Sequence, residues 1–426
     1  MNFFEAEMAR CARRIRNIEA NPDPTKLKAN KLYYELELDL RRDQLKALQE
    51  GKPFAQGAGA EALLKAMGVQ YLQLLTEGDR TTHVPKHFDT VRVLGLPDDA
   101  CDRTVLPIAL SVSGELPKPA LLISSNTACD PVIYAINALS RCHNVPCFFI
   151  DIGTEATEDT LRYVNDQLRE LIDFVERSIP GVKYDEDRLV EVQEADRQAY
   201  KYLNDIYQVM KVTPCVLSGR DVFRIPRFPS SYPNPAKAVE YFRTYRDEVE
   251  EMAQKKTPKE EQLRILWAVT APINADLFGF LEKKGVSVPF FQYGFAGRYY
   301  GAKYGVYGDV TEYGRRLTPI EEEARMLNCN SFHGLASRWV GDTVEICRDL
   351  RIDGIVNFTQ VGCTAILGIE RLLSDAAERE LGIPTLQLEG RMLDAREYDQ
   401  TRFEDALEDF VDMCLSKKEE GRTAAG

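Results

Sequence analysis

Residues 354–363 read Gly-Ile-Val-Asn-Phe-Thr-Gln-Val-Gly-Cys, an apolar run that ends in a polar turn and a cysteine. Residues 121–129, Leu-Leu-Ile-Ser-Ser-Asn-Thr-Ala-Cys, have the same pattern in the first half of the chain. Each run predicts a buried strand, and the residues after each cysteine predict a helix. Cys129 and Cys363 therefore fall at strand ends, on the edge where open parallel sheets bind their ligands.

Strand and helix patterns alternate around both runs, which indicates parallel sheets. In the first half we expect strands over 69–74, 119–124 and 146–150, with helices over 61–68 and 131–140. In the second half we expect strands over 263–269, 286–292, 355–358 and 385–389, with helices over 276–284, 338–350, 364–381 and 401–416. The pattern predicts an α/β fold with two open, mostly parallel-sheet domains of the Rossmann or flavodoxin-like type.

The domains expected from this alternation are joined by helical segments. We expect an N-terminal helical segment (1–60), a first α/β domain (61–160), a helical connecting segment (161–258), a second α/β domain (259–416) and a disordered tail (417–426).

Composition excludes several classes of protein. A net charge of −13 argues against a nucleic-acid or anionic-membrane binder, which would be basic. No apolar run approaches the roughly 20 residues that span a bilayer, and the charged N-terminus does not resemble a signal peptide. We therefore expect a cytoplasmic protein whose ten cysteines stay reduced, most of them as buried thiols.

Three cysteines are candidate metal ligands: Cys101, Cys129 and Cys363. Three thiolates can hold three irons of a [4Fe–4S] cluster and leave the fourth iron open, whereas an electron carrier normally uses four cysteines. The alternative is three buried thiols, since no C-x-x-C is present. Cys142 and Cys147 enclose His143 at metal-like spacing, but their apolar surroundings favour core packing.

An aromatic, glycine-rich stretch over 293–318 follows an expected strand and carries several cations. A loop of this length in a compact domain is usually functional. Its aromatic and basic residues suit a flat acyl group on a phosphorylated carrier such as coenzyme A, or else a subunit interface. The candidate substrate-binding residues are Tyr293, Arg298, Tyr299, Tyr300, Lys303 and Tyr304.

Two further motifs are weighed against structural roles. His333 is the best acid–base candidate by its chemistry, with Tyr299 as a second candidate, although a loop histidine satisfied by its neighbours is the more usual case. The run Gln-Gly-Ala-Gly-Ala at 56–60 precedes a helix but follows no expected strand, so it does not indicate a dinucleotide site. No P-loop motif is present.

The same segments resemble the 2-hydroxyacyl-CoA dehydratase / benzoyl-CoA reductase family. The resemblance lies in Leu-Ile-Ser-Ser-Asn-Thr-Ala-Cys-Asp-Pro-Val, Asn-Val-Pro-Cys-Phe-Phe-Ile-Asp, Gly-Ile-Val-Asn-Phe-Thr-Gln-Val-Gly-Cys and Glu-Leu-Gly-Ile-Pro-Thr-Leu-Gln-Leu-Glu-Gly-Arg, and spans roughly 60–415. Arg391 stands where the family usually has an acid. The continuation Val-Gly-Cys-Thr-Ala-Ile-Leu-Gly is most similar to the larger, B-type subunit of ATP-dependent (class I) benzoyl-CoA reductase.

The resemblance implies a cofactor and several partners. One [4Fe–4S] cluster would be held by Cys101, Cys129 and Cys363. A homologous cluster-bearing subunit would pair with this chain, and actin-like ATPase activator subunits with a bridging [4Fe–4S] cluster would deliver electrons from ferredoxin at the expense of ATP. No nucleic-acid or membrane partner is implied.

The implied reaction is low-potential electron transfer to an acyl-CoA, giving a ketyl-like radical anion. In a benzoyl-CoA reductase of anaerobic aromatic degradation, further reduction gives a cyclic dienoyl-CoA. The alternative is a 2-hydroxyacyl-CoA dehydratase, in which the radical expels a hydroxyl and the electron is recycled. A non-catalytic iron–sulfur electron-transfer protein and an α/β protein with inert thiols remain as readings from other classes.

Overall fold

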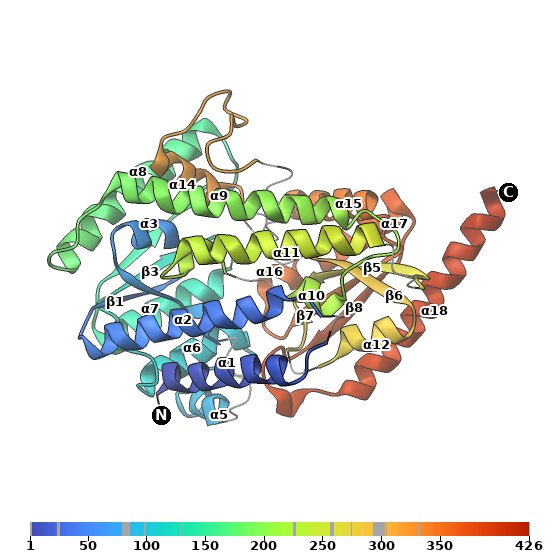
Figure 1. Ribbon diagram of the computed structural model, residues 1–426, viewed down its shortest axis with the longest axis horizontal. Coiled ribbons are helices and arrows are strands. Elements are labelled where there is room, and N and C mark those ends of the chain that lie inside the picture. The colour runs from blue at the N-terminus through green and yellow to red at the C-terminus, as the bar shows by residue number, and fades with distance from the viewer. Residues whose placement is uncertain are drawn as a thin grey trace.

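The computed structural model describes residues 2–425 except 24–25, 79–85, 98, 128, 225–226, 256–259, 274, 293–302, 304 and 331–332, and it leaves out the side chains of 421–425. Over these residues the chain forms two four-stranded parallel sheets with helices on their faces. The first sheet lies on the left of Figure 1 and the second on the right. The fold is therefore α/β with two parallel-sheet regions, as the sequence predicts.

The first sheet has short strands. They are β1 (Phe54–Gly57), β2 (Gln70–Gln73), β3 (Leu121–Ser125) and β4 (Cys147–Ile150), in the order β2-β1-β3-β4. All pairs are parallel, and Ala55 of the central strand lies opposite both Tyr71 and Leu121. β1 and β3 are buried at every position, as expected for strands covered on both faces.

The second sheet repeats this topology with longer strands. They are β5 (Leu263–Val269), β6 (Val286–Gln292), β7 (Gly354–Gln360) and β8 (Thr385–Gly390), in the order β6-β5-β7-β8. These pairs are also parallel, with Trp267 of the central strand opposite Phe291 and Val356. In each sheet the first strand lies between the second and the third, so the strand order reverses at one point.

Helices cover both sheets and connect them. Those of the first domain are α3 (Glu61–Ala66), α4 (Leu74–Gly78), α5 (Lys86–Val93), α6 (Asp102–Val112) and α7 (Asp130–His143). Those of the second are α12 (Leu277–Lys283), α15 (Ala336–Leu350), α16 (Thr364–Leu367), α17 (Glu370–Leu381), η2 (Ala395–Glu397) and α18 (Gln400–Ala425), whereas α14 (Pro319–Asn328) packs on the first sheet. The remaining ones are α1 (Phe3–Ala20), α2 (Ala29–Gln49), α8 (Glu158–Ser178), α9 (Glu186–Val209), α10 (Gly219–Phe223), η1 (Pro229–Ser231) and α11 (Pro235–Lys255).

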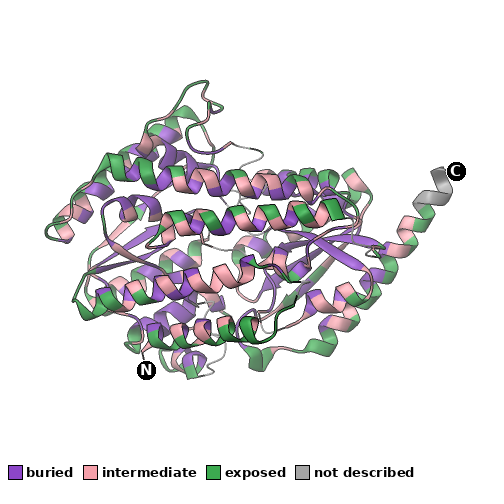
Figure 2. Ribbon diagram, viewed as in Figure 1, coloured by how far each residue is buried: buried purple, intermediate pink, exposed green. Residues whose placement is uncertain are grey.

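Helix α9 connects the two cores. Leu189 and Val192 near its start pack with the first sheet, whereas Leu203 and Tyr207 near its end pack with the second. α11 runs beside α9 across the front of both sheets in Figure 1. Figure 2 shows buried and exposed residues alternating along both helices, the pattern of an amphipathic surface helix. The connecting segment thus joins the two sheets into one structure.

A buried group of charges joins the N-terminal helices to the rest of the chain. Arg41 of α2 pairs with Glu77 of α4 at 2.7 Å, and both side chains are fully buried. Arg227 pairs with Glu77 at 3.0 Å and with Glu37 at 3.4 Å, and the Tyr232 hydroxyl donates to Glu37 at 3.0 Å. Removing one partner of a buried pair typically costs about 3–5 kcal/mol, because the other charge is left uncompensated.

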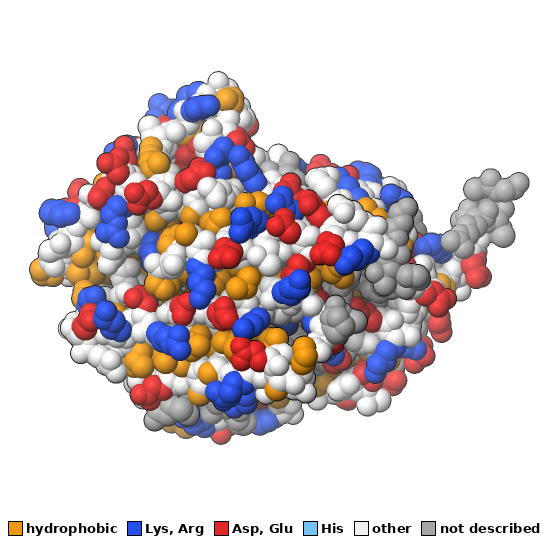
Figure 3. Space-filling view, in the orientation of Figure 1, with side chains coloured by type: hydrophobic (Ala, Val, Ile, Leu, Met, Phe, Trp, Pro, Cys, Tyr) orange, Lys and Arg blue, Asp and Glu red, His pale blue; other side chains and the backbone are white. Residues whose placement is uncertain are grey.

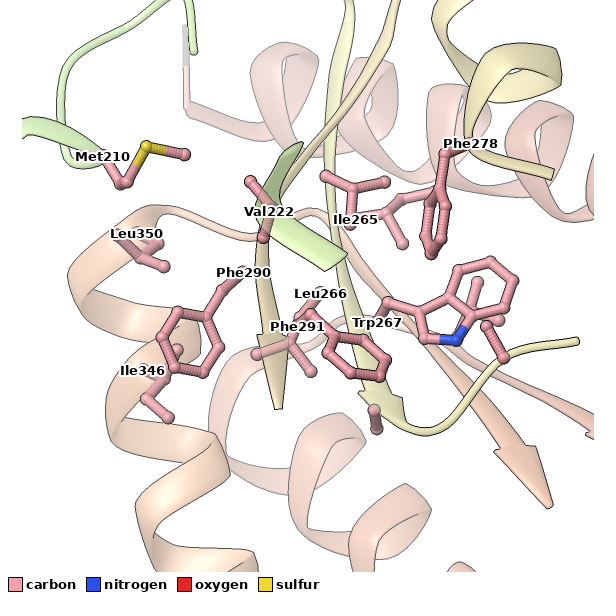
Figure 4. Packing of buried hydrophobic residues seen from close by; sticks show 14 of the residues in the cluster. Met210, Val222, Ile265, Leu266, Trp267, Phe278, Phe290, Phe291, Ile346 and Leu350 are labelled. Atoms are coloured by element: carbon pink, nitrogen blue, oxygen red, sulfur yellow. The ribbon is translucent and has the colours of Figure 1, made fainter. Parts of the chain in front are cut away.

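The core of the second domain is rich in aromatic residues. Figure 4 shows Trp267, Phe278, Phe290 and Phe291 among aliphatic neighbours from several elements. The Trp267 and Phe278 rings meet edge to face with centroids 5.0 Å apart, and the Trp267 Nε1–H donates to the Thr270 carbonyl at 2.6 Å. Strands β5, β6 and β7 are buried at every position of this core, which is why their sequences are recognisable as apolar runs.

Three expectations about the elements were wrong. Residues 54–57 form β1, so the first sheet begins inside the segment expected to be helical, and the Gln-Gly-Ala-Gly-Ala run does follow a strand. The helix expected over 364–381 is divided at residues 368–369 into α16 and α17. The tail expected to be disordered after Lys417 continues as helix α18 to Ala425, because Lys417 and Lys418 pair with Glu378 and Asp353.

The surface carries both signs of charge. Figure 3 shows Lys and Arg side chains interspersed with Asp and Glu on this face, without a continuous patch of one sign. Among the described helices, none is long and apolar enough to cross a membrane.

Candidate functional site

The three candidate cysteines occupy the same kind of local position. Cys101, Cys129 and Cys363 are the N-cap residues of α6, α7 and α16. Cys129 follows β3 and Cys363 follows β7, which are the third strands of two sheets with the same strand order. Both cysteines therefore lie at the carboxyl edge beside the point where the strand order reverses, where open α/β sheets bind ligands.

The turns that carry Cys101 and Cys363 are packed directly on one another. Gly362 has φ +78°, and a methyl group added there would lie 2.0 Å from the Asp99 carbonyl oxygen and 2.8 Å from the Cys101 amide nitrogen. No side chain fits at 362, so the second domain approaches the first through bare backbone. This contact brings the N-termini of α6 and α16 together.

The three thiols influence one another. Burial, with the neighbouring Cys363 as the next largest cause, raises the pKa of Cys101 to about 12 and that of Cys129 to about 11. Burial also raises the pKa of Cys363. The Arg103 guanidinium acts in the opposite direction on the pKa of all three thiols. Because the thiolate is the metal ligand, a metal that binds here has to displace three protons and supply positive charge in their place.

A single metal ion and a four-iron cluster make different demands on the spacing of their ligands. Within the described residues, no three His, Cys, Asp or Glu side chains lie close enough to share one metal ion. The ligands of a four-iron cube bind separate irons, so they stand farther apart than the ligands of one ion. Cys101, Cys129 and Cys363 are N-caps of three helices, and the charges of the three thiols interact, so the set is a candidate for such separate ligands.

A cavity of about 810 Å³, within the usual size range of ligand sites, is lined by other residues than the three candidate cysteines. Its walls come from the segment after β4, from the described end of the 293–318 loop and from the start of α15. The lining residues are Thr154, Glu155, Ala156, Lys303, Gly305, Asp309, Val310, Thr311, Glu312, Cys329, Leu335, Ser337 and Arg338.

The two cations of the cavity are held differently. Lys303 pairs with Asp342 and, at 2.8 Å, with Glu345. Arg338 instead donates to backbone carbonyls, including that of Asn328 at 3.1 Å, and its Nε is buried. Arg338 thus has neutral hydrogen-bond partners, whereas the partners of Lys303 are carboxylates. Arg338 was not among the residues predicted from the sequence.

His333 joins the two domains. Its ring is buried, with Nδ1 3.2 Å from the Asn126 carbonyl oxygen and Nε2 2.6 Å from that of Gly153. The neighbouring Gly334 has φ +88°, and a methyl group there would lie 2.4 Å from the Thr154 carbonyl oxygen. Both ring nitrogens are thus engaged with loops that follow β3 and β4, which favours the structural role for this histidine.

The other predicted residues are resolved unevenly. Tyr293, Arg298, Tyr299, Tyr300 and Tyr304 lie outside the described residues, so the structure does not place them. The expected core packing is wrong for Cys142, which is exposed at the end of α7, whereas Cys147 in β4 is half-buried against the core. The His143 Nε2 lies 2.7 Å from the Ser111 hydroxyl. Cys11, Cys215, Cys329, Cys347 and Cys414 are buried, as expected for cysteines in the core.

The fold and the site together define a class of protein: a two-sheet α/β protein with three neighbouring thiols at helix N-caps and a cavity of ligand size. The model of the 2-hydroxyglutaryl-CoA dehydratase D-component family matches residues 60–414, which is most of the chain. The chain therefore belongs to this family, as its resemblance to 2-hydroxyacyl-CoA dehydratases and benzoyl-CoA reductases implied.

Three curated relatives are similar over different lengths. The (R)-phenyllactyl-CoA dehydratase alpha subunit of Clostridium sporogenes is 22% identical over 76% of this chain and 79% of its own length. The (R)-2-hydroxyglutaryl-CoA dehydratase subunit alpha of Acidaminococcus fermentans is 23% identical over 71% of this chain and 62% of its own length. The lactoyl-CoA dehydratase subunit alpha of Anaerotignum propionicum is 27% identical over 33% of this chain and 34% of its own length.

Proposed function

We propose that this chain is a subunit of a 2-hydroxyacyl-CoA dehydratase and that Cys101, Cys129 and Cys363 hold one [4Fe–4S] cluster. The single observation that carries the proposal is that two N-cap cysteines at equivalent strand ends, Cys129 and Cys363, lie near a third N-cap cysteine, Cys101. Support also comes from the family match and from three relatives whose names end in dehydratase alpha subunit.

The residues of the chain have distinct tasks in this proposal. When bound, the cluster would supply low-potential electrons and an open iron for a substrate oxygen. Cys101, Cys129 and Cys363 would hold it as thiolates. The Arg103 guanidinium lowers the pKa of all three and so favours the charged form that binds metal. The substrate would need a pocket beside the cluster that excludes water, because water would protonate a radical anion.

The acyl-CoA would bind in the cavity beside Lys303 and Arg338. The phosphates or the carboxylate of such a substrate would pair with Arg338, whose donors now meet carbonyl oxygens. Exposed Val310 and Leu335 on the cavity wall offer apolar surface for the acyl group. Tyr293, Arg298, Tyr299, Tyr300 and Tyr304 remain proposed pocket residues on the loop that ends at this wall.

The first expectation from the sequence, a benzoyl-CoA reductase subunit, is less well supported by the comparisons than the dehydratase. It stays a second candidate because of one specific feature, the run Thr-Ala-Ile-Leu-Gly that follows Cys363. The two candidates differ in electron balance. Dehydration of a 2-hydroxyacyl-CoA to an enoyl-CoA and water consumes no electrons overall, whereas ring reduction adds two electrons and two protons to the arene.

The proposed partners follow from the same family. The relatives are named as alpha subunits, so each belongs to a complex with a further subunit. We propose a homologous cluster-bearing subunit, ATPase activator subunits with a bridging [4Fe–4S] cluster, and ferredoxin as the electron donor of the complex.

The proposal is tested on the complex purified without oxygen through a tag on this chain. Product mass is measured after incubation with ATP, a strong reductant and either a (R)-2-hydroxyacyl-CoA or benzoyl-CoA. A dehydratase converts the hydroxyacyl-CoA to a product lighter by one water and leaves benzoyl-CoA unchanged. A product heavier by two hydrogens from benzoyl-CoA supports the reductase instead, and a complex that has no iron and converts neither substrate contradicts both.

A further inference from the structure

Arg391, just after β8 of the second domain, contacts both sequence neighbours of Cys101 in the first domain. Its Nη1 donates to the Asp102 carboxylate at 2.8 Å and to the Ala100 carbonyl oxygen at 3.1 Å. Its Nε donates to Glu397 at 3.1 Å, which fixes the other side of the guanidinium. One nitrogen of the second domain thus holds the residue before Cys101 and the residue after it.

The Asp102 carboxylate is held by groups of the second domain. It is fully buried, and its Oδ2 accepts from the backbone N–H of Leu393 at 3.0 Å and from that of Asp394 at 3.4 Å. A carboxylate is buried at tolerable cost only when charge and hydrogen bonds compensate it. The ion pair with Arg391 therefore decides where the first residue of α6 can lie.

A second contact fixes the same turn from another side. Gly362 packs on the backbone of Asp99 and Cys101, as described above, and Gly362 immediately precedes Cys363. The Cys101 turn is thus held between the Gly362 turn and the segment after β8. Because Cys101 has no strand of its own before it, these contacts with the second domain determine its place.

We propose that Arg391 is a positioning residue which, through Asp102 and Ala100, fixes the Cys101 sulfur relative to that of Cys363 and so allows the three cysteines to share one cluster. The identity of the cluster rests on the proposed function. The position of the Cys101 turn rests on the contacts alone. Either the identity of the cluster or the role of Arg391 can therefore be wrong while the other holds.

The proposal predicts the effect of changing each partner. In Arg391→Gln the buried Asp102 carboxylate loses its countercharge, and the first turn of α6 moves or takes up water to solvate it. In the double variant Asp102→Asn with Arg391→Gln, two neutral amides replace the two charges, and the Asn oxygen still accepts the backbone N–H groups. The double variant should therefore recover much of what the single variant loses.

The experiment uses the complex purified without oxygen and three measurements on it. Iron and sulfide per chain, the electron paramagnetic resonance signal of the reduced cluster, and amide hydrogen exchange over 99–106 after removal of metal are compared. For Arg391→Gln we expect exchange about tenfold faster than in the wild type, at least about threefold less iron, and an altered signal from the cluster that remains. Arg391→Lys and the double variant should both stay within about twofold of the wild type.

Arg396→Gln is the matched control. Arg396 also joins the two domains, pairing with Asp394 at 2.8 Å and with Asp89 of α5 at 2.9 Å, but it contacts neither neighbour of Cys101 in these pairs. This variant should keep the iron, the signal and the exchange over 99–106. Wild-type values in Arg391→Gln, or an equal loss in Arg396→Gln, would overturn the proposal. A wild-type protein without iron would refute the proposed function, and exchange would still decide the role of Arg391.

Discussion

The two sheets of this protein have the same strand order but differ in length and cover. The strands of the first sheet span four or five residues, whereas those of the second span six or seven. Three strands of the second sheet are buried throughout, while β4 of the first leaves Phe149 42% exposed. Cys129 and Cys363 still occupy equivalent turns. Strand order, rather than strand length, therefore determines where these two cysteines lie.

The third cysteine breaks this correspondence. Cys101 precedes α6 and does not follow a strand, and the second domain holds its turn through Gly362 and Arg391. The site is thus composed of two cysteines in equivalent places and one that depends on contact between the domains. The predictions below test this difference, from the largest expected effect to the smallest.

Serine in place of any of the three N-cap cysteines should remove most of the bound iron. A serine hydroxyl is a much poorer ligand for iron than a thiolate, and two thiols do not hold a cube that needs three. Cys129→Ser and Cys363→Ser should lose iron alike, because their positions are equivalent. Iron per chain is measured after anoxic purification. Cys142→Ser and Cys147→Ser serve as controls that keep the iron, and full retention in all three ligand variants would refute the assignment.

Gly57→Ala should unfold the first sheet. Gly57 has φ +147°, and a methyl group there would lie 1.8 Å from the Ile123 carbonyl oxygen of the neighbouring strand. We expect a loss of about 4 kcal/mol or more in the free energy of unfolding, measured by urea denaturation. Gly51→Ala is the control, since Gly51 also has positive φ but open space around it. It should cost only about 1 kcal/mol. Equal losses would show that backbone strain, not the close approach of β3, matters at residue 57.

Trp267→Ala should destabilise the second domain by about 3–5 kcal/mol, the usual cost of removing a large aromatic residue from a core. Trp267 is fully buried in the central strand, against Phe278. If the two domains unfold separately, the transition of the second should move and that of the first should not. Calorimetry distinguishes these transitions. A loss below about 1 kcal/mol would mean that this core repacks freely.

The helical connection between the sheets should make stability depend on pH. Burial raises the pKa of Asp196 on α9 to about 8 and that of Glu323 on α14 to about 7. The unfolded chain releases these protons while the folded chain keeps them, up to about pH 8 for Asp196 and up to about pH 7 for Glu323. Stability therefore falls as pH rises through these ranges, by at most roughly 1.4 kcal/mol per pH unit for each group.

Asp196→Asn should flatten this dependence, since an amide does not ionise. Urea denaturation at pH 5 and at pH 8 measures the difference, and the exposed Asp159→Asn serves as the control with an unchanged slope. Parallel pH profiles for the wild type and Asp196→Asn would contradict the assignment of the proton to this buried carboxyl.

Much of the fold follows from the sequence because burial on both faces makes a strand a continuous apolar run. The expected strands 263–269 and 286–292 have the observed bounds of β5 and β6. β1 was missed because it has only four residues, two of which are Gln56 and Gly57. α14 was not predicted because it begins directly after the aromatic stretch 293–318. The sequence does carry its start signal, since Thr318 caps the helix through a capping box.

The candidate site was predictable only in part. The strand-to-helix turns of Cys129 and Cys363 carry a local signal, whereas the approach of Cys101 depends on contacts between residues far apart in the sequence. Arg391 and Asp102 form an ion pair although most of the chain separates them in the sequence. Arg338 donates to backbone carbonyls, and sequence patterns do not predict where those carbonyls lie. Glycines with positive φ, such as Gly362, stand where two backbones approach closely, but a single sequence does not show which segment each glycine approaches.

The central claim is that three cysteines from two sheets hold one cluster, and the most direct test is the content of iron and acid-labile sulfide per chain. The wild-type chain is kept away from oxygen from cell lysis onward, and both elements are determined together with the protein concentration. The account predicts about four irons and four sulfides per chain, as one [4Fe–4S] cluster requires. Iron and sulfide at background level in protein that is folded and has never met oxygen would contradict it.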